Sequence, residues 1–318
     1  MTIQQHTFDI PYMVAPVHCY TVETAGGELI LIDTGPPTGK AKDYLRKSID
    51  FSRLTAVVIT HCHIDHCGLA SWLEKETEAT IYVPYRDGLR IIGHETRLKG
   101  LYQTLRDLGF GDDFLSRLSH TLNSGPFVPP FPENYRTIEL DLPVSLGISY
   151  LSCPGHSQSD LVFLGEDWAI TGDVLLRGFF HSPLLDVDPE TGERFQNYHA
   201  YCATLVKLGT IRDRRILPGH LERVDNVDAT ILFYIGKMLE RAAKLQPHAD
   251  DDNVARIIAR QFGENMIEPL NIFFKASEIC FIKDFLAEPD RLHDALQTIG
   301  LFDAVADKFQ AALSPLEE

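Results

Sequence analysis

The sequence has few basic residues and lacks the segments that mark an exported or membrane-spanning protein. It contains 29 Lys and Arg against 45 Asp and Glu among 318 residues, so its formal net charge is −16 at pH 7. A chain this acidic is a poor partner for nucleic-acid backbones and anionic membranes. Its first ten residues contain neither a basic nor an apolar segment, and no apolar run is long enough to span a bilayer. We therefore expect a protein that binds neither nucleic acid nor membrane.

The sequence also lacks a disulfide framework. The spacing of its six cysteines is not that of a disulfide scaffold, and no Cys-x-x-Cys motif occurs. We interpret the cysteines as reduced thiols and expect a cytoplasmic protein. Hydrophobic residues make up 44% of the chain and charged residues 23%, as in ordinary globular proteins. The cysteines are Cys19, Cys62, Cys67, Cys153, Cys202 and Cys280.

Four potential metal ligands occur within the stretch Thr60–Gly68, directly after the apolar, β-branched run 54–59. That run is typical of a buried strand. One cation rarely accepts four ligands from so short a loop with good geometry, whereas two neighbouring cations can share them. Imidazole and carboxylate suit zinc, iron or manganese. A polar loop with chance histidines is the alternative interpretation. The four potential ligands are His61, His63, Asp65 and His66.

The stretch resembles the His-x-His-x-Asp-His signature of the metallo-β-lactamase superfamily. Three more potential ligands follow downstream, each just past an apolar strand pattern and each next to a glycine. Glycine permits sharp turns and close backbone approach, which a crowded metal site requires. Together the motifs span Thr60 to His220. The three downstream residues are His156, Asp173 and His220.

The resemblance implies a fold, a ligand assignment and a chemistry. One metal would take His61, His63 and His156, the second would take Asp65, His66 and His220, and Asp173 would bridge them. Such a pair, about 3.5–4 Å apart, can hold a bridging hydroxide that attacks substrate at neutral pH. No serine or cysteine nucleophile is then needed, and Asp65 would in addition accept a proton during turnover. We expect two divalent ions per chain, with zinc favoured and iron or manganese open.

Two further positions near these motifs carry expectations. Asp33 follows the apolar run Leu29–Ile32, and the matching Asp-x-Gly element of the superfamily supports the metal loop; capping a turn is the alternative. His181 lies in the loop Gly178–Pro183, which should overhang the metals, so we expect a catalytic contact with substrate or else a plain hydrogen bond. We expect five other histidines to be surface or packing residues: His6, His94, His120, His248 and His293.

Strand and helix patterns alternate through the first 224 residues and predict α/β layering. The resemblance implies an αββα sandwich over residues 1–224, followed by an all-helical region, residues 225–318. Leucines at helical spacing predict a helical insertion at about residues 86–135, which could pad an edge or form a lid. Expected strands and helices include Cys19–Val22, Leu29–Ile32, Lys40–Ile49, Leu54–Ile59, Leu69–Leu73, Thr80–Val83, Thr137–Leu140, Gly147–Leu151, Leu161–Leu164, Trp168–Thr171 and Arg215–Leu217.

We predict a binuclear metal-dependent hydrolase that cleaves an acyl ester or thioester of a small molecule. The insertion and helical tail are more similar to the glyoxalase-II and thioesterase-like branches than to antibiotic-degrading lactamases. Phe179 and Phe180 would suit an apolar acyl chain, and few basic residues stand near the motifs: Arg177 and Arg223. A phosphodiesterase, a lactonase and a metal-binding signalling or partner-binding protein with low turnover remain alternatives, and a homodimer is open.

Overall fold

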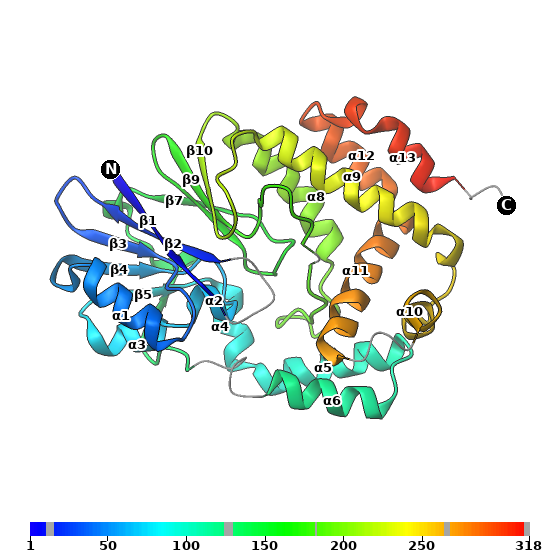
Figure 1. Ribbon diagram of the computed structural model, residues 1–318, viewed down its shortest axis with the longest axis horizontal. Helices are drawn as coiled ribbons and strands as arrows, with labels where there is room; N and C mark the ends of the chain where they lie inside the picture. Colours follow the sequence, from blue (N-terminus) through cyan, green and yellow to red (C-terminus); the bar gives the residue numbers. More distant parts are fainter. Residues whose placement is uncertain (11–15, 124–129, 182, 264–267, 315–318) are drawn as a thin grey trace.

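The protein contains two β-sheets, which lie in the left half of the view in Figure 1, with the C-terminal helices in the right half. The computed structural model describes residues 1–10, 16–123, 130–181, 183–263 and 268–314. The first sheet has the order β1-β2-β3-β4-β5-β6, with β1 to β3 antiparallel and β3 to β6 parallel. Its strands are β1 (Thr2–Phe8), β2 (Val17–Glu23), β3 (Leu29–Ile32), β4 (Leu54–Val58), β5 (Thr80–Val83) and β6 (Tyr135–Thr137).

The second sheet has the order β10-β9-β8-β7. β7, β8 and β9 are antiparallel, and β10 runs parallel to β9. The hairpin predicted around the turn at 165–167 is therefore confirmed. The strands of this sheet are β7 (Ser149–Ser152), β8 (Leu161–Leu164), β9 (Trp168–Gly172) and β10 (Arg215–Pro218).

Three clusters of buried side chains show that the two sheets pack face to face with helices outside each. One cluster joins the sheets, with Ile30 and Val58 from the first and Phe163 and Ile170 from the second. A second cluster covers the outer face of the first sheet with helices α1 (Gly39–Ser48) and α3 (Ala70–Glu76). In the third cluster, the outer face of the second sheet packs against helices within residues 94–122 and helices from Asn197 onward. The αββα sandwich predicted from the resemblance is confirmed.

Three helices fill the chain between β5 and β6, where the sequence predicts an insertion. They are α4 (Tyr85–Ile92), α5 (His94–Asp107) and α6 (Asp112–Leu122). α6 packs against the C-terminal helix α11 (Pro269–Ala287). The sequence after α6 contains the proline-rich stretch Gly125–Pro132, most of which lies outside the described residues.

The strand predicted at Thr137–Leu140 is wrong. β6 ends at Thr137, and the next four residues form the single-turn helix α7 (Ile138–Asp141). The Asp141 carboxylate accepts a hydrogen bond from the backbone N–H of Thr137 at 3.2 Å, which satisfies a free donor at the helix start. The strand predicted from Gly147 begins at Ser149 instead, because Gly147 has a positive φ of 68° after a short 3-10 turn.

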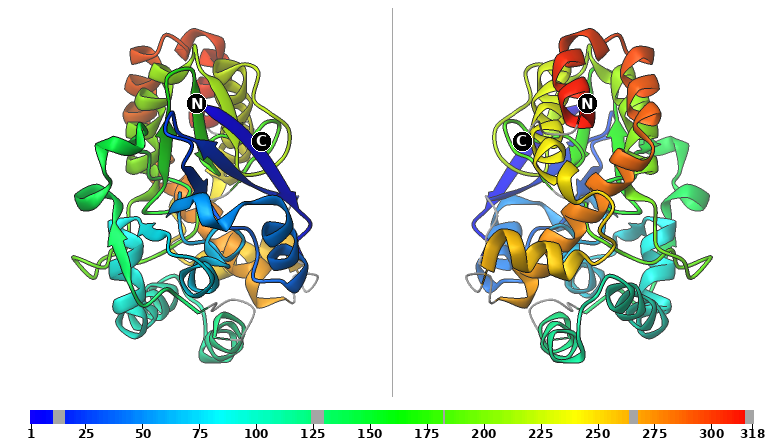
Figure 2. Two further views of the ribbon diagram at one scale, coloured as in Figure 1. Left: turned by 90° about the vertical axis from the view of Figure 1, so that its left-hand side faces the viewer. Right: turned by 90° about the vertical axis from the view of Figure 1, so that its right-hand side faces the viewer.

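After Val224 the described residues form helices joined by short turns and contain no strand, as predicted (Figure 2). Its buried faces share one cluster with the outer face of the second sheet, so the helical region is packed onto the sandwich. None of the described helices is long and apolar enough to cross a membrane. The helices of this region are α9 (Val227–Leu245), α10 (Val254–Phe262), α11, α12 (Pro289–Thr298) and α13 (Ala306–Leu313). Helix α8 (Asn197–Leu208) precedes the region.

Candidate metal centre

All seven predicted metal ligands meet at one end of the two sheets. They follow β4, β7, β9 and β10, and two of them, Asp65 and His66, lie in the short helix α2 (Ile64–Cys67) after β4. Because the two sheets pack face to face, these loops from both sheets come together at a shared edge. The ligand-bearing residues are His61, His63, Asp65, His66, His156, Asp173 and His220.

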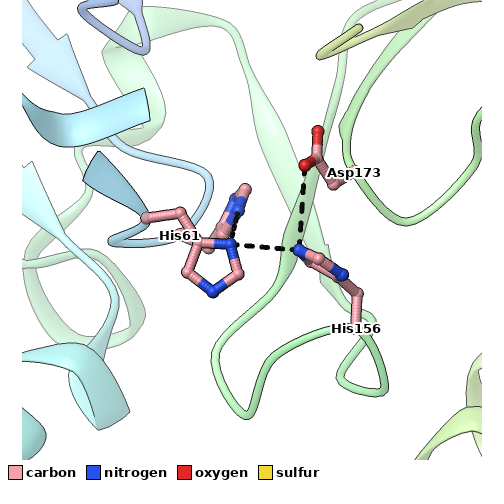
Figure 3. Close-up of side chains that lie close together, drawn as sticks. His61, His156 and Asp173 are labelled. Carbon is pink, nitrogen blue, oxygen red and sulfur yellow. Dashed lines mark hydrogen bonds and ion pairs between the residues drawn. The ribbon is translucent and has the colours of Figure 1, made fainter. Parts of the chain in front are cut away.

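The first group of potential ligand atoms comes from three histidines and a carboxylate. His63 Nδ1 lies 3.0 Å from His61 Nε2 and 3.1 Å from His156 Nε2. His156 Nε2 also lies 3.7 Å from Asp173 Oδ2. Figure 3 shows the side chains of His61, His156 and Asp173 directed toward one another. The ligand atoms of this group all lie within 4.8 Å of one another, a size that one cation can fill.

The second group adjoins the first. His220 Nε2 lies 3.3 Å from both His66 Nε2 and Asp65 Oδ2. Asp173 reaches this group as well, with its Oδ1 3.3 Å from His66 Nε2 and its Oδ2 3.5 Å from His220 Nε2. The Asp173 carboxylate is therefore within reach of both groups.

The arrangement fits a cation better than it fits the protein alone. Among the described residues, Asp173 Oδ1 is buried with no hydrogen-bond partner and only an ion-pair contact of 3.3 Å with His66 Nε2, although burial of a carboxylate oxygen without hydrogen bonds is costly. His61 Nε2 and His63 Nδ1 face each other, and so do the Nε2 atoms of His66 and His220, so each pair needs a proton or a cation between its nitrogens. A metal ion in each group would satisfy the nitrogens and the carboxylate together.

A family model decides the identity of the fold. The model of the metallo-beta-lactamase superfamily matches residues 12–220, which include every one of these ligands. The chain belongs to the metallo-beta-lactamase superfamily. It is similar to a probable metallo-hydrolase, YqjP, from Bacillus subtilis (strain 168), which is 26% identical over 265 residues that cover 76% of this chain and 78% of that protein.

Solved structures of the superfamily share the fold along most of the chain. A metallo-beta-lactamase family protein from Thermus thermophilus has a TM-score of 0.68 at 20% identity, with 90% of this chain and 94% of that chain covered. A beta-lactamase domain protein from Burkholderia ambifaria has a TM-score of 0.71 at 18% identity, with 90% and 87% covered. At these identities the likeness shows the fold alone.

The histidines of the site are of two kinds, those whose pKa is lowered and those whose pKa is raised. Burial holds the pKa of His61 and His63 well below the usual value, so both are neutral imidazoles. Burial acts the same way on His66, but Asp173 and Asp33 outweigh it and raise the pKa of His66 well above the usual value. Burial also opposes a charge on His220, yet Asp173 and a hydrogen bond with Asp65 raise the pKa of His220. His66 therefore carries a proton beside the carboxylates of Asp65 and Asp173, and a divalent cation would have to displace that proton.

Neighbouring side chains orient the ligands. Asp33 accepts hydrogen bonds from the Thr60 N–H, from the Thr60 hydroxyl and from His66 Nδ1, each at 2.8 Å. Thr60 Oγ1 in turn lies 3.0 Å from His61 Nδ1. The support that the resemblance assigned to Asp33 thus has a structural counterpart on both ligand groups. Gly219 leaves room for the site, because a Cβ there would lie 2.5 Å from Asp173 Oδ1 and 2.7 Å from His66 Cε1.

His181 lies next to the site, as expected for a loop that overhangs it. Its ring centroid is 4.9 Å from that of His156, and its buried Nδ1 has no hydrogen-bond partner among the described residues. Burial lowers the pKa of His181 to about 3, so the ring is neutral. The Tyr234 hydroxyl of α9 donates to the His181 carbonyl at 2.8 Å. The C-terminal helices therefore help to position the His181 loop.

The two phenylalanines of the same loop differ. Phe180 stacks on Tyr234 with centroids 4.5 Å apart and packs against the core, whereas Phe179 is 42% exposed. Among the histidines expected on the surface or in packing, His6 is fully buried in the first sheet and His293 packs edge-on against Phe302. The described cysteines are all free.

Sequence reasoning missed three buried polar residues near the site. His18 of β2 pairs with the Leu221 carbonyl through Nε2 at 2.7 Å, beside His220. Asp160 accepts from the Ser157 N–H at 2.6 Å and shapes the loop that follows His156. Asp87 of α4 accepts from the Cys62 N–H at 2.7 Å, inside the first metal loop. Only the short Ser157–Asp160 spacing is a local sequence signal, typical of a side-chain-capped turn.

Proposed function

We propose that the protein is a binuclear metal-dependent hydrolase that cleaves an acyl ester or thioester of a small molecule. The observation that carries the proposal is the position of Asp173. Its Oδ1 lies 3.3 Å from His66 Nε2, and its Oδ2 lies 3.7 Å from His156 Nε2. A carboxylate between two complete ligand groups suits a pair of ions that share a ligand. Zinc is favoured for the imidazole-rich set, with iron or manganese as alternatives.

The chemistry follows from what each group can do. Two divalent cations bound here would lower the pKa of water and act as Lewis acids toward a substrate carbonyl. Asp65 lies at the second group with Oδ2 close to His220, where it can accept a proton. His181 presents a neutral, buried ring whose Nδ1 can hydrogen-bond a substrate oxygen. Asp33 and Thr60 hold the His66 and His61 rings so that their other nitrogens face the site.

A pocket beside His220 supports the acyl substrate. It has a volume of about 540 Å³ and is flanked by apolar Pro16 and Leu221. Among its described lining residues the one guanidinium is that of Arg177, which already pairs with Asp225 at 2.9 Å and with Glu222 at 3.4 Å. A phosphodiester carries a fixed negative charge that calls for a free cation, whereas an acyl group does not. None of the seven ligands lines this pocket or the larger hollow of about 700 Å³ at Asp107 and residues 247–260. Leu221 of the smaller pocket directly follows His220, so we assign the substrate to the smaller pocket.

A paired assay tests the substrate class. Chromogenic acyl esters, thioesters and lactones are compared with a bis-aryl phosphodiester at equal metal loading, and we expect the highest kcat/KM for an ester or thioester. A higher kcat/KM for the phosphodiester or for a lactone would replace the proposal with that alternative. Full turnover by the purified protein alone would speak against a signalling or partner-binding role with low turnover.

The metal content tests the binuclear claim independently of the substrate. We expect close to two metal ions per chain by elemental analysis after purification without a chelator. Because the second group must release protons to accept a cation, metal affinity should rise with pH. Saturation at one ion per chain, with Asp65 and His66 uncoordinated, would contradict the binuclear site.

A further inference from the structure

Helix α4 of the insertion binds the metal loop between its first two histidines. The Cys62 N–H donates to Asp87 Oδ2 at 2.7 Å, and Arg90 Nη2 donates to the Cys62 carbonyl at 2.8 Å. Arg90 and Asp87 also pair with each other, with Arg90 Nη2 3.1 Å from Asp87 Oδ1. Both polar backbone groups of the residue between His61 and His63 are therefore held by one helical turn.

The same carboxylate reaches the loop that carries the third histidine. The Ser159 hydroxyl donates to Asp87 Oδ2 at 2.6 Å, and Ser159 stands three residues after His156. Asp87 thus connects the loop after β4 in the first sheet with the loop after β7 in the second. The three histidines of the first ligand group lie on these two loops.

The Asp87 carboxylate depends on these particular partners because it is buried. Asp87 is 1% exposed, so water cannot replace its donors. A buried carboxylate is stable only with charged and hydrogen-bonded partners, which here are Arg90, the Cys62 N–H and the Ser159 hydroxyl. Loss of the carboxylate would leave donors from both loops without their acceptor, and the loops would have to shift to find new ones.

The second ligand group is held from other elements. His66 Nδ1 pairs with Asp33 at 2.8 Å, and His220 Nδ1 lies 3.2 Å from the Pro16 carbonyl. The His18 N–H donates to the Gly219 carbonyl at 2.7 Å, next to His220. These supports come from the start of β2 and from the turn after β3. Asp33 also reaches His61 of the first group through Thr60, whereas the α4 residue Asp87 contacts the two loops that carry His61, His63 and His156.

We propose that Asp87 is a positioning residue for the first metal site, formed by His61, His63 and His156. The inference rests on the proposed two-metal function, and it assigns the start of the insertion as a fixed support of that site. Through Cys62 and Ser159, Asp87 sets the separation of the two loops, and with it the spacing of the three imidazoles. Loss of such outer hydrogen bonds costs about 10- to 100-fold in metal affinity in other metal sites.

Cobalt titrations in single-site backgrounds test the inference. In a His220→Ala background only the first group remains complete, and Asp87→Asn should weaken Co²⁺ binding there by about 10- to 100-fold and alter the Co²⁺ ligand-field spectrum. In a His61→Ala background the second group remains, and Asp87→Asn should leave its Co²⁺ affinity within about threefold of that background. Equal weakening in both backgrounds, or none in the first, would overturn the proposal.

Two further variants separate positioning from general destabilisation. Ser159→Ala removes one donor and leaves the Asp87 carboxylate in place. In the His220→Ala background it should weaken Co²⁺ binding by a smaller factor than Asp87→Asn does. This variant keeps the test valid if Asp87→Asn folds poorly. Arg86→Gln is the matched control, because Arg86 neighbours Asp87 on α4 but pairs outward with Asp188 at 2.9 Å. Added to the His220→Ala background, Arg86→Gln should leave the Co²⁺ affinity of that background unchanged, and a loss equal to that of Ser159→Ala would contradict the proposal.

The wild-type titration separates this inference from the proposed function. If the wild-type chain binds a single Co²⁺, the binuclear function fails, whatever the Asp87 variants do. If it binds two and Asp87→Asn binds both with wild-type affinity, the binuclear function stands and the role of Asp87 fails. No assay of hydrolysis is needed for either decision.

Discussion

Asp33 Oδ2 lies 2.8 Å from His66 Nδ1, and both side chains are buried. With Nδ1 donating to the carboxylate, the other nitrogen of His66 is left to face His220 and Asp173. Asp33 adopts a left-handed backbone with φ of 59°, a conformation that Asp and Asn tolerate better than other non-glycine residues. Asp33, directly after β3, thus fixes the orientation of His66, a potential ligand in the short helix α2.

Asp33→Asn should weaken metal binding at the second group while keeping the backbone conformation. Asparagine tolerates the left-handed region, but its neutral amide is a poorer acceptor for His66. We expect a loss of about 10- to 100-fold in metal affinity. Metal-binding calorimetry of chelator-treated protein measures it, and unchanged affinity would show that the contact does not orient His66.

Asp173→Ala should lower metal content and activity together and leave the fold largely intact. The carboxylate is within reach of both ligand groups, whereas the strands around it are held by apolar packing. We expect kcat/KM to fall by more than about 100-fold. Elemental analysis, circular dichroism and turnover are measured on the same sample. Wild-type turnover with both metals bound would exclude Asp173 as the bridge.

His181→Ala should reduce turnover without loss of metal. The ring adjoins His156 but belongs to neither group of potential ligands. If it hydrogen-bonds a substrate oxygen, its removal should lower kcat by about 100-fold at unchanged metal content. Because burial lowers the pKa of His181 to about 3, its ionisation should not shape the pH–rate profile at neutral pH. Wild-type kcat in the alanine variant would leave His181 a structural role.

Truncation after Val224 should give insoluble or dimer-deficient protein. The buried faces of α9 and α11 share a cluster with β8, β9 and α8, and Tyr198 of α8 donates to the Glu288 carbonyl at 2.9 Å. Removal of these helices would expose the apolar outer face of the second sheet. Size-exclusion chromatography with light scattering and a solubility assay measure the outcome. A soluble, fully active truncation of unchanged association state would show the helical region to be an independent appendage.

His6 should make the metal-free protein less stable in mild acid. Burial lowers the pKa of His6 from its usual 6.5 to about 4. Between these values the unfolded chain binds more protons than the folded one, so stability falls as pH drops from 6.5 toward 4. The whole shift is worth roughly 3 kcal/mol.

His6→Gln isolates this effect. The glutamine cannot ionise and can still bond Thr21, which lies 3.0 Å from His6 Nε2. Urea unfolding of chelator-treated wild type and variant should show their stability difference change in favour of the variant as pH falls through this window. A difference that stays constant across the window would contradict the buried neutral state of His6.

Local pattern was sufficient for most strands and for the metal loop. The β-branched run before Thr60 forms β4, and the paired apolar runs around residue 166 form a hairpin, because each encodes burial within a few residues. The pattern failed at Thr137–Leu140, where the Thr137 N–H donates to the Asp141 carboxylate and the strand gives way to a helical turn. A single side-chain contact outweighed a weak strand propensity there.

The sequence by itself determined which residues could bind metal, since imidazoles and carboxylates at the ends of apolar strands are a local property. Only the tertiary structure decided how those residues are held. Asp87 meets Cys62 across 25 positions and His18 meets Leu221 across 203, and neither pair leaves a periodic signal. Such contacts exist because the two sheets pack face to face and bring distant loops to one edge. Spacing within a motif can specify ligands, but the supports of those ligands are set by the packing of the whole chain.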